Sequence, residues 1–204
     1  MLTLACDGLV AELDPVRAEP IGLYFGLEDR ARSVPLIWPA PRPVPRPVPR
    51  PAEPPDGFEI LDRSPLSARF VRTAPSRPTR RFELEPGALR IGLGSLSPDA
   101  AAAQGDREEI VLELARCPFS LGDRPEVGVH DGALLRLQWT RHTTTLTLRA
   151  AAGRLELRSD LSIDDPYIAV ALRADDDGAA EASLEVEGGP ARLDGRADAA
   201  EDLS

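Results

Sequence analysis

The segment ALLRLQWTRHTTTLTLRAAAGRLELRS, residues 133–159, decides the fold class of this chain. Its first run places Leu135 and Leu137 on one side of the backbone and Arg136 and Gln138 on the other. Successive side chains of a strand point to opposite faces of a sheet, so this alternation predicts a strand with one buried face. The next two runs, TTLTLRA and RLELRS, alternate in the same way. One buried face and one solvated face are typical of antiparallel sheets.

Similar runs occur through the rest of the chain, separated by Gly, Pro and Asp residues that favour turns. Roughly ten short strands in sequence predict a sandwich or a barrel. We therefore expect an all-β protein whose main domain is an antiparallel β-sandwich of the jelly-roll kind. The predicted strands span residues 2–6, 9–13, 21–27, 58–61, 67–72, 80–85, 88–94, 109–115, 133–139, 144–150, 154–159, 167–173 and 181–187.

The chain divides by composition into four parts. We assign residues 1–38 to a β-rich N-terminal extension, 39–57 to a proline-rich arm, 58–193 to the sandwich and 194–204 to an acidic tail. In the extension, two apolar runs flank an Asp-Gly pair at residues 7–8, which predicts a tight hairpin. A hairpin with one further strand is marginal alone, so the extension is expected to dock on the main domain or on a partner.

The arm carries the sequence PAPRPVPRPVPRPAEPP at residues 39–55. Proline at alternate positions excludes a helix or a central strand and favours extended polyproline II structure. We interpret the arm as a stiff spacer and assign partner binding to Trp38, Arg42, Arg46 and Arg50. A large aromatic side chain at the start of such an arm is a typical interface anchor.

One short helix is expected after residue 96. Ser97 is suited to the N-cap, Pro98 to the first helical position and Gly105 to the C-terminal stop, with four alanines between them.

Composition limits the function classes. The 204 residues include 24 basic residues, all arginine, so no Schiff-base or P-loop lysine is present. The net charge of −10 comes entirely from residues 160–204, and a neutral body with an acidic end argues against nucleic-acid binding. No apolar run is long enough to span a bilayer, and the N-terminus lacks the apolar core of a signal peptide. We expect no membrane association and a cytoplasmic protein, or part of a particle assembled in the cytoplasm.

No catalytic, metal-binding or cofactor-binding residue is assigned. His130 precedes an Asp-Gly pair and is interpreted as part of a hairpin turn, and His142 as a solvent-facing residue at a strand start. The two cysteines, Cys6 and Cys117, have no zinc-binding spacing.

Two acidic arrangements are candidate sites. Aspartates at 160, 164 and 165 and at 175–177 offer calcium ligands, but a strand of about 20 Å separates the clusters, so turn formation is favoured. Glu109 and Glu113 lie about 13 Å apart on one strand face, too far for the paired carboxylates of a glycoside hydrolase.

Residues 108–187 resemble concanavalin A-like or laminin G-like jelly rolls. The resemblance rests on a strand with a central aromatic residue, a Thr-rich strand, a Gly-containing turn and the acidic-Pro-aromatic stretch DDPYIAVAL. It implies a lectin-like sandwich, and no carbohydrate or calcium ligand transfers with it.

These observations favour a non-enzymatic structural subunit of a larger protein assembly, such as a phage-tail-like or capsid-like connector, with other protein subunits as partners. The alternative is a glycan-binding, lectin-like module, and a jelly-roll hydrolase is third.

Overall fold

The computed structural model describes residues 1–26, 34–37, 57–74, 77–97, 108–119, 123–162 and 165–188. Within these ranges the chain is almost entirely strand, with one short 3-10 helix and no helix that is long and apolar enough to cross a membrane. The elements are β1 (Leu2–Cys6), β2 (Leu9–Asp14), β3 (Glu19–Phe25), β4 (Val34–Ile37), β5 (Phe58–Arg63), β6 (Ser67–Arg72), β7 (Pro78–Glu85), β8 (Ala88–Ser95), β9 (Glu109–Ala115), β10 (Glu126–His130), β11 (Leu134–Trp139), η2 (Thr140–His142), β12 (Thr144–Ala152), β13 (Arg154–Leu157), β14 (Tyr167–Arg173) and β15 (Ala180–Glu187).

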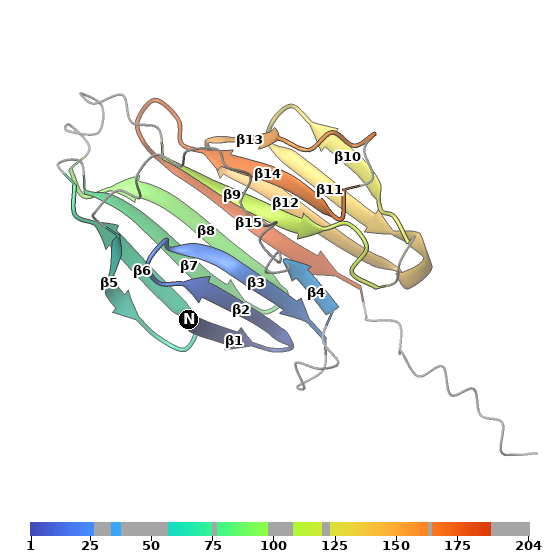
Figure 1. Ribbon diagram of the computed structural model, residues 1–204, viewed down its shortest axis with the longest axis horizontal. Coiled ribbons are helices and arrows are strands. Elements are labelled where there is room, and N and C mark those ends of the chain that lie inside the picture. Colours follow the sequence, from blue (N-terminus) through green and yellow to red (C-terminus); the bar gives the residue numbers. More distant parts are fainter. Residues whose placement is uncertain are drawn as a thin grey trace, which may run out of the picture.

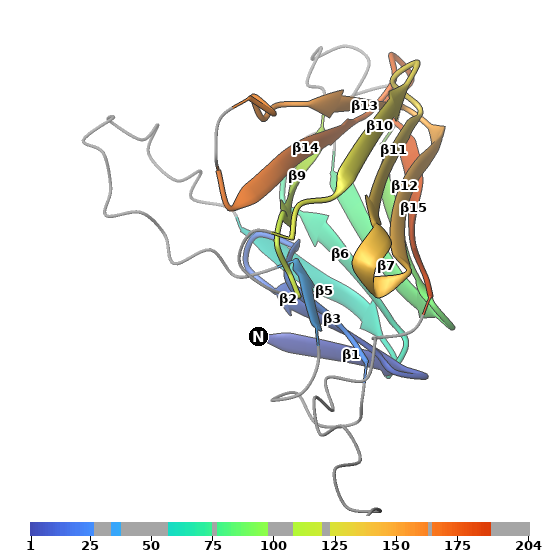
Figure 2. The ribbon, with the colours of Figure 1, turned by 90° about the vertical axis from the view of Figure 1, so that its right-hand side faces the viewer.

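The strands form two antiparallel sheets that face one another (Figures 1 and 2). One sheet has seven strands in the order β1-β2-β3-β4-β9-β14-β13. The other has eight strands in the order β10-β11-β12-β15-β8-β7-β6-β5. The predicted all-β antiparallel sandwich is confirmed, because the inward residues of both sheets form one hydrophobic cluster.

The N-terminal strands belong to this sandwich. β4 lies beside β9, with Ile37 opposite Leu114, so the first four strands extend the seven-stranded sheet. Leu4 and Trp139 are members of the same buried cluster. The sequence left open whether the N-terminal extension docks on the main domain or on a partner. The structure shows that its described strands pack on the main domain. The predicted hairpin at residues 7–8 is also present, between β1 and β2.

Arg80 joins the two sheets through their interior. It lies on β7 of the eight-stranded sheet and is only 6% exposed. Its guanidinium donates to Glu108 Oε2 at 3.2 Å, to the Glu109 carbonyl at 2.9 Å and to the Arg17 carbonyl at 3.0 Å. The Phe58 ring centroid lies 4.7 Å from the guanidinium carbon. A charge this deep is tolerated because hydrogen bonds and a cation–π contact replace its hydration.

Strand β10 was not predicted. Its sequence EVGVH has only two large apolar residues, and Val129 is 49% exposed. The strand lies at the edge of its sheet, where the contrast between a buried and a solvated face is weak.

Several predictions fall outside the described residues. They are the proline-rich arm up to residue 56, the helix from Pro98 to Gly105 and the acidic tail at 194–204. The boundaries drawn between the four parts of the chain stay a prediction.

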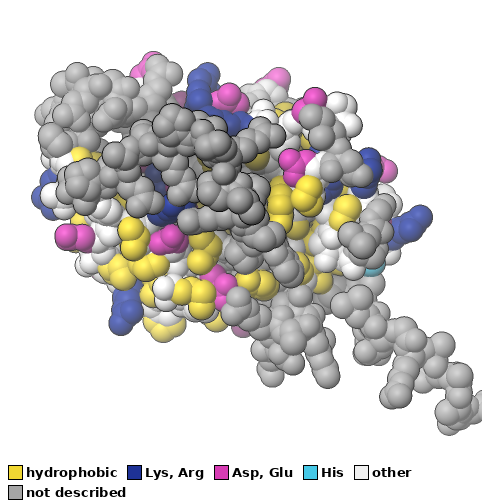
Figure 3. Space-filling model, viewed as in Figure 1, with side chains coloured by type: hydrophobic (Ala, Val, Ile, Leu, Met, Phe, Trp, Pro, Cys, Tyr) yellow, Lys and Arg dark blue, Asp and Glu magenta, His cyan; other side chains and the backbone are white. Residues whose placement is uncertain are grey.

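Positive and negative side chains are interspersed with apolar ones over the described part of the face shown in Figure 3. A surface of mixed sign agrees with the even charge balance of residues 1–159.

Candidate functional site

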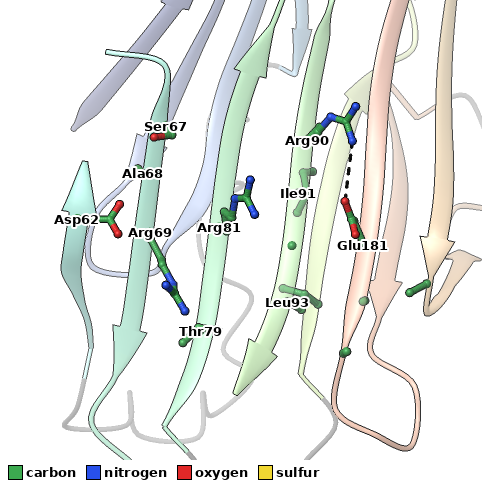
Figure 4. A pocket seen from close by; sticks show the side chains of 14 residues that line it. Asp62, Ser67, Ala68, Arg69, Thr79, Arg81, Arg90, Ile91, Leu93 and Glu181 are labelled. Atoms are coloured by element: carbon green, nitrogen blue, oxygen red, sulfur yellow. Dashed lines mark ion pairs between the residues drawn. The ribbon is translucent and has the colours of Figure 1, made fainter. Parts of the chain in front are cut away.

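A groove of about 550 Å³ crosses the outer face of the eight-stranded sheet (Figure 4). Its volume lies within the range of small-molecule sites. Five charged side chains line it, each from a different strand: Asp62 of β5, Arg69 of β6, Arg81 of β7, Arg90 of β8 and Glu181 of β15. Four of these strands, β5 to β8, follow one another in the sequence, and β15 joins them from the C-terminal part of the chain.

Strand register places most of these residues in a single row. Asp62 pairs with Arg69, Arg69 with Arg81, Arg81 with Gly92 and Gly92 with Glu181. Residues that are directly opposite on neighbouring strands share a face of the sheet. Their neighbours along the strands, such as Phe70, Phe82 and Ala182, are core residues. The row consequently faces away from the core.

Arg81 and Arg90 already have acidic neighbours. Arg81 is hydrogen-bonded to Glu83 on its own strand. Arg90 lies 2.8 Å from a Glu85 carboxylate oxygen and 4.0 Å from one of Glu181. The hydrogen bond to Glu85, with the charge of that carboxylate, raises the pKa of Arg90 above its ordinary value. These pairs are exposed, so they orient the side chains and contribute little to stability.

Gly92 forms part of the groove floor, between Arg81 and Glu181. A Cβ at this position would meet the Arg81 Cβ at 3.6 Å, an ordinary contact. The backbone of Gly92 thus does not require glycine, and glycine inside a strand weakens it. Its effect here is to leave open space between a guanidinium and a carboxylate.

The residues of the groove define what it can do chemically. Guanidinium groups donate several hydrogen bonds in a fixed plane, which suits hydroxyl pairs and anions. The carboxylates Asp62 and Glu181 can accept hydrogen bonds or protons. Within the described ranges, no three His, Cys, Asp or Glu side chains lie close enough together to hold a metal ion.

The interpretation of His142 as a solvent-facing residue is wrong. Its side chain is 19% exposed, and its Nε2 lies 2.9 Å from Asp123 Oδ2. The imidazole stacks on Phe119 at 4.2 Å between centroids, and Phe119 packs edge-on against Trp139. Trp139 in turn donates from Nε1 to the Arg116 carbonyl. The cluster closes one end of the core, so its evident role is structural.

The turn assignments are confirmed. His130 is the last residue of β10, and Asp131 and Gly132 connect it to β11 with positive φ angles of 47° and 66°. Asp160 and Asp177 accept hydrogen bonds from backbone amides two residues later, as turn-forming aspartates do.

Glu109 and Glu113 lie on β9 of the other sheet. Glu109 Oε2 accepts from Arg158 at 2.7 Å and from Arg173 at 3.1 Å. The Glu109 carboxylate is therefore part of an ion-pair network on that sheet.

The four residues assigned to partner binding, Trp38, Arg42, Arg46 and Arg50, lie outside the described residues. Their role in partner binding stays a prediction.

Comparison with solved structures shows which fold this is. The chain is similar to a galactose mutarotase related enzyme from Lactobacillus acidophilus, with a TM-score of 0.56 and 12% identity, over 93% of this chain and 98% of that one. It is also similar to the GalM/aldose epimerase homologue from C. elegans, with a TM-score of 0.51 and 11% identity, over 92% and 98% of the two chains. A galactose mutarotase-like protein from Lactobacillus casei ATCC 334 matches with a TM-score of 0.50 and 12% identity, over 92% and 99%. No protein-family model and no curated protein sequence matches the chain.

These likenesses correct three predictions. The resemblance to concanavalin A-like or laminin G-like domains is wrong, because the sandwich matches the mutarotase-like one over nearly its whole length. The interpretation as a phage-tail-like or capsid-like assembly subunit is contradicted by the same matches, as is the prediction that the chain is not an enzyme. The strand pattern is common to many sandwiches, so it could not separate these folds. The described chain has the galactose mutarotase-like fold.

Sequence reasoning missed the groove residues. Each arginine was visible on the solvated face of its own predicted strand, but strand order and register are needed to bring them together. The available signal was an outward arginine on each of three successive strands, with Gly92 two residues after the arginine on the third of them.

Proposed function

We propose that the chain binds a sugar over Gly92 and interconverts the anomers of that sugar. One observation carries the proposal: Arg81 and Glu181 face each other across the open position at Gly92. Two strand spacings separate their backbones by about 10 Å, which leaves room for one sugar ring between the side chains. The shared fold with proteins described as mutarotase-related or aldose epimerase homologues supports the same class of ligand.

The chemistry requires proton transfers and the reversible opening of the sugar ring. Glu181 accepts the proton of the anomeric hydroxyl while Arg81 donates a hydrogen bond to the ring oxygen. The bond between the anomeric carbon and the ring oxygen then breaks, and the ring oxygen takes a proton from solvent. The open-chain aldehyde rotates and closes on its other face, which returns both protons and gives the other anomer.

Exchange spectroscopy by NMR, with galactose and glucose as probes, tests the proposal. The unmodified chain should accelerate interconversion of the anomers, and Glu181→Gln should slow the catalysed rate by about 100-fold or more. Glu187→Gln is the matched control, because Glu187 lies on the same strand and is exposed but does not line the groove. Gly92→Val should abolish the activity by filling the space over the floor.

A glycan-binding module is the second candidate. It is favoured by the absence of histidine, the usual acid–base residue at neutral pH, from the residues that line the groove. Sugar binding that Gly92→Val abolishes, without any acceleration of anomer exchange, would support this function over the first.

A further inference from the structure

Arg69 differs from the other arginines of the groove. It is half-buried, and it makes no ion pair with the described residues, whereas Arg81 and Arg90 both do. In Figure 4 its side chain extends along the sheet toward Thr79 and away from Asp62. Its guanidinium is therefore the positive charge of the groove that has no acidic partner in the described chain.

Arg69 is paired in register with Asp62 of β5 on one side and with Arg81 of β7 on the other, and its side chain extends away from Asp62 (Figure 4). Like charges at paired positions destabilise a sheet. An anion between the two guanidinium groups would remove this repulsion, since planar guanidinium groups bind carboxylate, sulfate and phosphate oxygens well.

A second hollow adjoins the groove on the same strands. It has a volume of about 470 Å³ and is lined by residues that include Val71 and Arg77. Val71 pairs with Thr79, which lines the groove, so the two depressions meet on β6 and β7. Arg77 is exposed and has no ion pair with the described residues, and Glu59 also lines this hollow. Each depression thus contains one arginine that makes no ion pair with the described residues.

The groove is longer than a single sugar ring. The groove extends from β5 to β12 across five strand spacings, about 24 Å. One ring over Gly92 leaves the part over β5 and β6 empty, and this part carries Arg69.

We infer that the ligand is an acidic oligosaccharide. One of its sugar units lies over Gly92, and the chain continues across β7 and β6 so that an anionic substituent is held by Arg69 and Arg81. This inference rests on the proposed function and adds the length and the charge of the ligand.

Isothermal titration of the full chain with three probes tests the inference: trigalacturonate, its neutral counterpart galactotriose, and galacturonate. Trigalacturonate should bind at least about tenfold more tightly than either of the others, and its advantage over galactotriose should shrink at high salt. Arg69→Gln should remove that advantage. Arg136→Gln should keep it, because Arg136 lies on the outer face of β11 but outside the groove.

Each contrary result overturns a different part of the inference about the ligand. Equal binding of trigalacturonate and galactotriose, unchanged by Arg69→Gln, would show that the ligand does not need an anionic substituent, and would leave sugar binding in the groove intact. Galacturonate binding as tightly as trigalacturonate would overturn the extended ligand. If none of the three sugars binds, and galactose and glucose show no accelerated exchange, the proposed function fails as well.

Discussion

Arg80 of β7 and Glu108, the residue before β9, form an ion pair of 3.2 Å that connects the two sheets from within the sandwich. Their side chains are only 8% and 12% exposed. Glu108 also pairs with Arg72 at 2.5 Å, so two arginines of the eight-stranded sheet share one carboxylate. The connection fixes the segment that precedes β9 against the opposite sheet.

Arg80→Met should destabilise the fold by about 3 kcal/mol or more, because it leaves carbonyl and carboxylate oxygens buried without their donor. Urea unfolding measures this loss. Arg158→Met is the control: its ion pair with Glu109 is about one-third exposed, so its loss should cost less than about 1 kcal/mol. Equal losses for both variants would show that Arg80 does not join the sheets.

Trp139→Ala should destabilise the fold by about 3–5 kcal/mol, as large-to-small changes in a core do. The indole is 1% exposed and donates to the Arg116 carbonyl at 3.1 Å. Thermal and urea unfolding give the value. A loss below about 1 kcal/mol would contradict the placement of Trp139 in the core.

His142 and Asp123 should be energetically coupled. A double-mutant cycle with His142→Gln and Asp123→Asn should give a coupling energy of about 0.5–3 kcal/mol, because the two side chains are in contact and Asp123 is 7% exposed. Additive effects of the two substitutions would show that the pair does not contribute to the end of the core.

Asp160 should titrate below its ordinary pKa of 3.8. The Ser162 hydroxyl and the Ser162 amide both donate to Asp160 Oδ1, and these hydrogen bonds lower the pKa of the carboxyl. Because the folded-state pKa is lowered, the stabilisation is complete above 3.8 and is lost as the pH falls through the folded-state value. Ser162→Ala should raise the pKa of Asp160 toward 3.8, as followed by NMR titration. An unchanged pKa would rule out the Ser162 hydroxyl as a cause.

Arg69→Gln should change the free energy of unfolding by less than about 1 kcal/mol, because it removes both the repulsion from Arg81 and the attraction to Asp62, which lie opposite Arg69 on its two neighbouring strands. Differential scanning calorimetry measures the change. A loss of stability well above about 1 kcal/mol would show that Arg69 has a structural partner, and its assignment to ligand binding would fail.

The sequence was sufficient to predict most of the strands but not the site. Alternation of Leu135 and Leu137 with Arg136 and Gln138 depends on one strand alone, and these residues lie as expected on opposite faces of β11. The row from Asp62 to Glu181 depends instead on which strands become neighbours. Strand order is set by tertiary packing, for which a single sequence carries no local signal.

His142 shows the same limit on a smaller scale. Its neighbours Arg141 and Thr143 are exposed and polar, so the local sequence favours solvent exposure. Its actual contacts, Phe119 and Asp123, lie about twenty residues away. Only the closure of the sandwich brings them to the imidazole.

The row of groove residues is complete only in the folded sheet. Asp62, Arg69, Arg81 and Gly92 lie on four consecutive strands, and Glu181 joins them only when β15 pairs with β8 in the eight-stranded sheet. A ligand that contacts Glu181 together with the other residues of the row binds only the folded chain. Free ligand therefore adds its binding energy to the global unfolding equilibrium. In hydrogen exchange, a saturating ligand should therefore slow the most protected core amides, which exchange by global unfolding, and not only the amides beside the groove.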